Sequence, residues 1–139
     1  MDNTERPKLI VAIEKCFFEG MRRGWASGAP AKANFPFNGA KGYEFHPLIV
    51  GELDRHLHYM TLFDYFFTNQ ESRTSYGTTV ILYLGNPVWV MNYGGWYRKE
   101  AVPIVKKALM AAYKENLFCG GRGINGFFCD ECLDLEYEN

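Results

Sequence analysis

The feature that most constrains this chain is the stretch from Val80 to Tyr97, VILYLGNPVWVMNYGGWY. Apolar runs cover residues 78–84 and 87–93, and Gly85-Asn86 separates them. Two runs rich in β-branched and aromatic residues around a short Gly-containing turn predict an antiparallel hairpin. Pro87 has no N–H for a strand ladder, so we expect a longer loop or a bulge where the second strand begins.

Both faces of the predicted hairpin are apolar. The alternating positions are Val80, Leu82 and Leu84 against Ile81 and Tyr83, then Val88 and Val90 against Trp89 and Met91. A hairpin with one face in water would alternate polar and apolar residues. We therefore expect a central hairpin, covered on both faces by helix, by a curled sheet or by another subunit.

The flanking sequence predicts two helices and further strands. The first helix follows a cap at Asn3 or Thr4 and ends at Gly24, and Pro103 opens the second. Their apolar stripes are Leu9, Ile10, Ile13, Cys16, Phe17 and Met21, and Val105, Ala108, Leu109, Ala112 and Tyr113. Strands are predicted over 43–50, from Leu57 to a polar loop at 68–77, and over 127–135. The order predicts one domain, 1–139, with a two-layer α+β fold: an antiparallel sheet of four to five strands with both helices on one face.

Residues 24–42 are rich in Gly, Ala and Pro and show no period. We expect a long loop that lies over the surface and inserts Trp25, Phe35 or Phe37 into it. Loops of this length in a compact domain are usually functional or mobile.

Composition excludes several classes of protein. The chain of 139 residues has a formal charge of -1, which gives no electrostatic case for direct nucleic-acid binding. It has no apolar run of membrane-spanning length and no signal-peptide core after MDNTERPK. These features predict a cytoplasmic protein without a membrane partner, whose four cysteines are thiols.

The end of the hairpin is the best candidate for a site. Asn92 and Tyr93 close an apolar strand and precede Gly-Gly-Trp-Tyr, where an amide and aromatic rings can orient a polar ligand. The residues predicted to bind a ligand are Asp64, Tyr65, Trp89, Asn92, Tyr93, Trp96, Tyr97 and Arg122. The alternative is that Asn92 ties down the strand end and Trp89 is core.

Catalytic and metal signals are weaker. Asp64, Glu52 or Asp54 could act as a general base, but spacing fixes no partner for them. His56 and His58 with Glu52 or His46 could hold a metal, although such pairs are common by chance. We predict no catalytic residue, no metal and no cofactor.

The cysteine and glycine motifs are also weak. Cys129 and Cys132 form a C-x-x-C with Cys119 ten residues earlier, but zinc lacks a fourth ligand at motif spacing. Asp130 and Glu131 between the thiols disfavour a redox role. Residues 121–126 match G-x-G-x-x-G but follow a helix, so a dinucleotide site is not predicted. Arg122 on this loop could hold an anion.

The segment PVWVMNYGGWY, followed by VKKAL and FCGGRG, resembles an uncharacterised bacterial domain family found free-standing or fused behind helix-turn-helix domains. The shared motif is Trp89, Met91, Asn92, Tyr93 and Gly95, and Asp64-Tyr65 resembles the family's preceding strand. The resemblance spans about residues 42–123, and the family's further pair of strands is not matched. It implies an aromatic site and a ligand-sensing or partner-binding role.

The sequence therefore favours a small binding domain with an aromatic-lined pocket or groove at the ends of the hairpin. Its predicted partners are a small-molecule ligand and a second copy of the chain. Two alternatives stay open: a protein-interaction module of the antitoxin or immunity type, and a hydrolase-like enzyme that uses Asp64, His58 and Arg122. A concave pocket favours the first reading, and a flat exposed aromatic patch favours the second.

Overall fold

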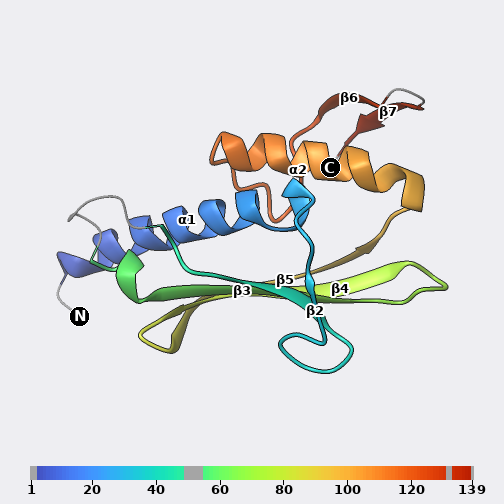
Figure 1. Cartoon of the computed structure of the whole chain (residues 1–139). Helices are drawn as coiled ribbons and strands as arrows, with labels where there is room; N and C mark the ends of the chain where they lie inside the picture. The colour runs from blue at the N-terminus through green and yellow to red at the C-terminus, as the bar shows by residue number, and fades with distance from the viewer. Residues whose placement is uncertain (1–2, 49–54, 131–132, 139) are drawn as a thin grey trace.

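A computed structural model of the chain describes residues 3–48, 55–130 and 133–138. It has two layers (Figure 1): helices α1 (Glu5–Arg23) and α2 (Val102–Lys114) lie on one face of a five-stranded antiparallel sheet. The α+β fold predicted from the sequence is confirmed. Neither described helix has the length and hydropathy of a membrane-spanning segment.

The strands follow one another in chain order across the sheet. They are β1 (Lys32–Ala33), β2 (Lys41–Phe45), β3 (Met60–Thr68), β4 (Thr74–Tyr83) and β5 (Asn86–Trp96). The predicted hairpin is β4–β5, and its turn uses Leu84 and Gly85, both with positive φ, which suits the right-handed twist of the strands. The register shifts between Ile81 and Leu82, so the bulge expected near Pro87 is present.

The core lies between the sheet and the helices. The inward positions of the sheet, including Met60, Leu62 and Ile81, pack against the buried stripe of α1. The predicted stripe of α2 is buried throughout, at Val105, Ala108, Leu109, Ala112 and Tyr113. Ile10 was assigned to the stripe of α1 but is exposed, because the buried stripe includes Ala12 and Phe18 instead.

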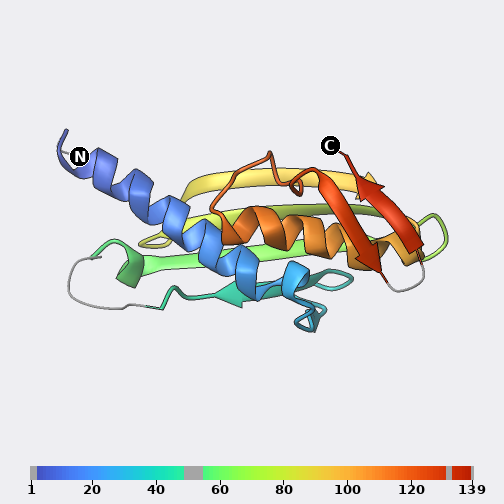
Figure 2. The same cartoon turned by 90° about the horizontal axis from the view of Figure 1, so that it is seen from above.

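Several predicted boundaries were wrong. The strand expected from Leu57 begins at Met60, after a 3₁₀ turn over Leu57–Tyr59. The polar loop expected over 68–77 is shorter, because β3 reaches Thr68 and β4 starts at Thr74. The last strand expected over 127–135 is a separate hairpin of β6 (Gly126–Asp130) and β7 (Leu133–Tyr137), and it packs against α2 (Figure 2).

The β4–β5 hairpin is not central. β5 is an edge strand of the five-stranded sheet, and both helices cover the same face of the hairpin. On the other face lies the β1–β2 loop (Figure 1), where Phe35 stacks on Phe63 and Phe37 contacts Tyr65 and Phe67. We call the sheet surface opposite the helices the outer face. The single chain therefore packs helices on only one face of the hairpin.

Candidate functional site: a cavity between the helices and the sheet

A cavity of about 1010 Å³ lies between the sheet and the helices. Its floor is the inward face of β2, β3, β4 and β5, and its roof comes from α2, the end of α1 and residues 25–31. The loop at 120–122 and the end of β7 also border it. Thus the helices fill only part of the space over the sheet, and the remainder is a pocket of ligand-binding size.

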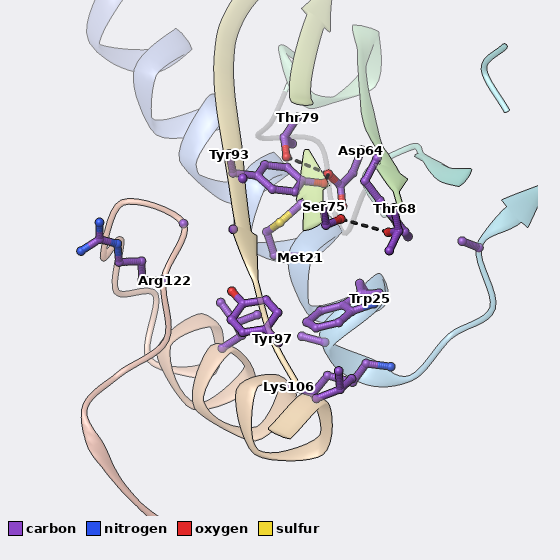
Figure 3. A pocket seen from close by; sticks show the side chains of 18 of the residues that line it. Met21, Trp25, Asp64, Thr68, Ser75, Thr79, Tyr93, Tyr97, Lys106 and Arg122 are labelled. Atoms are coloured by element: carbon purple, nitrogen blue, oxygen red, sulfur yellow. Dashed lines mark hydrogen bonds between the residues drawn. The ribbon is translucent and has the colours of Figure 1, made fainter. Parts of the chain in front are cut away.

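Asp64 lies on the floor of this cavity and is only 7% exposed. It stands between Tyr43 of β2 and Thr79 of β4 in the sheet register. Its Oδ1 accepts a 2.9 Å hydrogen bond from the Thr79 hydroxyl and a 2.7 Å bond from the Tyr93 hydroxyl (Figure 3). Neither donor is a cation, so this buried carboxyl is held by neutral partners.

Tyr93 reaches Asp64 from β5, with the strand β4 between them. Gly77 of β4 is the register partner of Tyr93. A Cβ built on Gly77 would clash with the Tyr93 ring, at 2.5 Å from its hydroxyl oxygen. Because glycine has no side chain, the Tyr93 ring can lie across β4 and place its hydroxyl on Asp64. The Gly77–Tyr93 pair therefore builds the hydrogen bond.

Burial changes the acid–base properties of these groups. It raises the pKa of the Asp64 carboxyl, and the hydrogen bonds from Tyr93 and Thr79 oppose that rise without cancelling it. Burial, followed by the charge of Asp64, also raises the pKa values of Tyr93, Tyr43 and Tyr113. These tyrosines stay protonated near neutral pH, so Tyr93 can donate its hydrogen bond to Asp64 and Tyr43 can donate one to the Ala29 carbonyl.

Aromatic side chains stand beside this polar floor. Trp25 and Tyr97 both line the cavity and appear below the Asp64–Tyr93 pair in Figure 3. The Lys106 ammonium lies 4.8 Å from the Trp25 ring centroid. Tyr43 donates a 2.6 Å hydrogen bond to the carbonyl of Ala29 and so ties the segment at 25–31 over the cavity. The site thus combines flat apolar walls with a few polar groups.

The predicted site residues fall on both faces of the sheet. Asp64, Tyr93, Tyr97 and Arg122 line the cavity, although the Arg122 guanidinium points away from the other labelled side chains in Figure 3. Trp89 is not among the lining residues: its ring packs 4.9 Å from that of Phe17 beside the core, as the alternative reading held.

Three other predicted residues belong to the outer face. Tyr65 contacts Phe37 there, and Trp96 is exposed. Asn92 borders the cavity, but its side chain accepts a hydrogen bond from Thr78 on the outer face. Consecutive strand residues point to opposite faces, so Asn92 and Tyr93 cannot both direct their side chains into one pocket. The structure therefore places Asn92, Trp96 and Tyr65 on one face of the sheet and Tyr93 on the other.

Sequence reasoning missed Tyr43, Thr79 and Gly77 as parts of the site. Each lies in a strand and shares the inward face with Asp64 or Tyr93. The sequence signal that could have pointed to them is an exception to a pattern. An acid, a threonine and a glycine occupy inward positions of strands whose other inward residues are mostly apolar. Their alignment follows from the register, which the sequence does not specify.

The alternative catalytic and metal groups do not assemble among the described residues. His58 is exposed and packs on Tyr59, away from the residues that line the cavity, so the trio of Asp64, His58 and Arg122 is not formed. No three His, Cys, Asp or Glu side chains of the described part of the chain are grouped as metal ligands. Glu52, Asp54 and Cys132 and the Cys129 side chain lie outside the described residues.

Comparison with models of protein families, with curated proteins and with solved structures finds no match to this chain. The resemblance carried by the Met-Asn-Tyr strand therefore stays a prediction, and the geometry of the cavity is the ground for the functional proposals.

Proposed function

We propose that this protein is a binding domain that holds a small polar molecule in the cavity between its helices and its sheet. The observation that carries the proposal is the buried Asp64 carboxyl on the cavity floor, held by Thr79 and Tyr93 at Oδ1 only. Among the described residues, no donor forms a hydrogen bond with Oδ2 of Asp64. Burying a carboxyl without a cationic partner costs stability, and perturbed groups in pockets are common at functional sites.

The bound molecule would use both parts of the cavity. A donor on the ligand would bond to Asp64, and a flat apolar body would pack against Trp25 and Tyr97. Because Tyr93 and Tyr43 already donate to Asp64 and Ala29, an acceptor on the ligand would bond to the hydroxyl of Tyr97 or Tyr113. The hydroxyls beside Asp64 belong to Thr79 and Tyr93, and both donate to its Oδ1. No His is among the described residues that line the cavity, so the geometry favours binding over acid–base catalysis.

The test is a thermal-shift screen of a metabolite library followed by binding measurements on two glycine variants. Gly77→Ala puts a methyl group under the Tyr93 ring on the inward face of the sheet. The backbone of Gly94 borders the cavity, but its built Cβ points to the outer face, 2.7 Å from the Tyr76 ring, so Gly94→Ala serves as the matched control. We expect compounds that bind the natural protein to lose affinity at least tenfold for Gly77→Ala and to keep it for Gly94→Ala. Equal effects of the two variants, or no binding compound at all, would contradict the proposal.

We propose a second role for the outer face, as the contact surface of a homodimer. The outward positions of β3, β4 and β5 carry no Lys, Arg, Asp or Glu. Large side chains are exposed there, among them Tyr76, Val90 and Trp96. A neutral apolar face is complementary to a second copy of itself, whereas a basic or acidic partner would find no charge to pair with.

The extent of the face supports this occupant. Strands spaced about 4.8 Å apart with a rise of about 3.3 Å per residue give β3 to β5 a flat area on the order of 450 Å². A standard interface buries about 800 Å² of accessible surface per partner, and side chains add to the flat area. The uncharged face is therefore of the same order as one side of a standard interface.

Light scattering from micromolar to submillimolar protein tests the dimer. We expect a mass of twice 16.0 kDa for the natural chain and 16.0 kDa for Val90→Lys. Ile10→Lys is the matched control, since Ile10 is 51% exposed on α1 and Val90 is 53% exposed on the outer face. A natural chain that stays at 16.0 kDa over the whole range, or equal dissociation by both variants, would rule out this interface.

A further inference from the structure

The charges around the cavity differ from those of the whole chain. Lys41, Arg73, Lys106 and Arg122 line it, against two acids, Asp64 and Glu138. The chain as a whole has a net charge of -1. A cavity lined mainly by one sign of charge focuses its field and attracts ligands of the opposite sign.

Three of these cations have no ion pair with a described carboxylate. Among the side chains that the structure describes, which exclude those of residues 127–136, no carboxylate lies within salt-bridge distance of Lys41, Arg73 or Lys106, whereas Lys8 and Arg23 elsewhere each have a glutamate at 3.1 Å. The described carboxylates therefore do not neutralise these three charges.

Arg73 gives the most direct indication that a partner is missing. It follows the β3 strand in the tight turn to β4, and its Nε is buried without a hydrogen-bond partner. A buried donor without an acceptor costs free energy, and such groups are rare in folded proteins. Among the described residues nothing holds this guanidinium by a hydrogen bond, so a bound anion can recruit it.

The polar groups are arranged in order along the cavity. Figure 3 shows Asp64, Thr79 and Tyr93 at one side, Trp25 and Tyr97 in the middle, and Lys106 beyond them. Lys41 is the register partner of Phe66, two residues from Asp64 along β3, and Thr68 and Ser75 share a 3.0 Å hydrogen bond that Figure 3 shows between Asp64 and Trp25. Cations therefore lie along the cavity, with Lys41 near the hydrogen-bonding groups and Lys106 beyond the rings.

We infer, on the basis of the binding function proposed above, that the ligand is a small organic anion with a planar body. Its carboxylate or phosphate group pairs with Lys106 in the field of Arg73 and Lys41, its ring lies against Trp25 and Tyr97, and a hydroxyl or amino group reaches Asp64 and Tyr93. A cationic amine is disfavoured because Lys106, Arg73 and Lys41 line the same cavity as Asp64, whose Oδ1 is already bonded twice.

Three phenols of nearly equal shape test the charge. They are 4-hydroxyphenylacetate, tyrosol and tyramine, which place an anion, a neutral hydroxyl and a cation at the same end. We expect titration calorimetry or NMR to show the anion binding at least tenfold more tightly than either of the others. Raising the salt from 50 to 500 mM should weaken the binding of the anion alone, because salt screens charge pairs. Phenyl phosphate against benzoate then distinguishes a phosphate from a carboxylate preference.

Variants locate the effect. Lys106→Gln and Arg73→Gln should each weaken 4-hydroxyphenylacetate about three- to tenfold, as expected for partly exposed charge pairs, and leave tyrosol unchanged. Lys114→Gln, on the same helix but exposed and outside the cavity lining, should change neither. Equal loss in all three variants would overturn the assignment.

The failure of this inference differs from failure of the binding function. Suppose that tyramine or tyrosol binds instead of the anion, or that only neutral and cationic compounds of the metabolite library bind, and that Gly77→Ala weakens this binding. Then the inference that the ligand is an anion is wrong, and the proposed binding function stands. If no compound binds in that manner, both are wrong.

Discussion

The hydroxyl of Tyr93 on β5 donates a hydrogen bond to Asp64 on β3 across the intervening strand β4, with 2.7 Å between the two oxygens. The ring can take this path because its cross-strand neighbour is Gly77. One rung further along, the arrangement is inverted: Tyr76 of β4 pairs with Gly94 of β5, on the outer face. Two adjacent rungs thus each place a tyrosine over a glycine, one toward the cavity and one away from it.

This pairing predicts different losses of stability for the two glycine variants. Gly77→Ala should lower the free energy of unfolding by about 1–3 kcal/mol, since it displaces a buried ring and breaks a hydrogen bond to a carboxyl. Gly94→Ala should lower it by less than about 1 kcal/mol, because Tyr76 is 63% exposed and can swing into solvent. Urea unfolding measures both. A larger loss for Gly94→Ala would mean that the outer tyrosine, not Tyr93, supports the fold.

The two tryptophans of β5 should also differ in how much each contributes to the free energy of unfolding. Trp89 packs against Phe17 and Phe118 beside the core, so Trp89→Ala should remove about 3–5 kcal/mol of unfolding free energy. Trp96 is 56% exposed, and Trp96→Ala should remove less than about 1.5 kcal/mol. Both should be measured in the Val90→Lys background, so that self-association does not contribute. Comparable losses would show that the Trp96 ring is buried.

The elements of this fold were readable from the sequence, but the site was not. The β4–β5 hairpin, its bulge and the stripe of α2 follow from local patterns of apolar residues and breakers, which act over a few positions. The cavity depends on which strand residues align across the sheet. Asp64 meets Thr79 and Tyr93 through register, and shifting a strand by one residue would turn its side chains to the other face.

The same reasoning explains why the predicted site was divided. Nearness in sequence grouped Asn92 with Tyr93 and Trp96, although strand alternation sends Asn92 and Trp96 to the face opposite Tyr93. The apolar character of both faces of the hairpin was read as burial on both sides. In the single chain only the helix side is packed, and the proposed dimer is what would cover the other.

Cys16 and Cys119 should differ in reactivity. Burial, followed by the nearby charge of Glu19, raises the pKa of the Cys16 thiol to about 12, so almost no thiolate exists at pH 8. Cys119 is only half-buried. Iodoacetamide at pH 8 with peptide mass spectrometry should modify Cys119 at least tenfold faster, and in denaturant the two should react equally. Equal rates in the folded protein would mean that α1 leaves the sheet readily.

The final prediction concerns Asp64 and pH. Burial raises the pKa of Asp64 in the folded state. The native protein therefore holds the proton of this carboxyl more tightly than the unfolded chain does, in which an aspartate has a pKa of about 3.9. Stability contributed by protonated Asp64 is therefore present at acid pH and is lost as the pH rises from about 4 through the raised pKa. Asp64→Asn keeps an oxygen for Thr79 and Tyr93 but cannot ionise.

Asp64→Asn should therefore match the natural protein near pH 4 and exceed it at pH 7 by on the order of 1 kcal/mol of unfolding free energy. Urea unfolding between pH 4 and pH 8 checks this, with the exposed Glu115→Gln as the control that should show no such trend. A variant that becomes progressively less stable than the natural protein as the pH rises would mean that the fold stabilises the carboxylate and that its pKa is lowered. If the variant is more stable at pH 7 yet fails to bind 4-hydroxyphenylacetate, stability and binding are opposed at this residue, as expected for a carboxyl that serves a ligand rather than the fold.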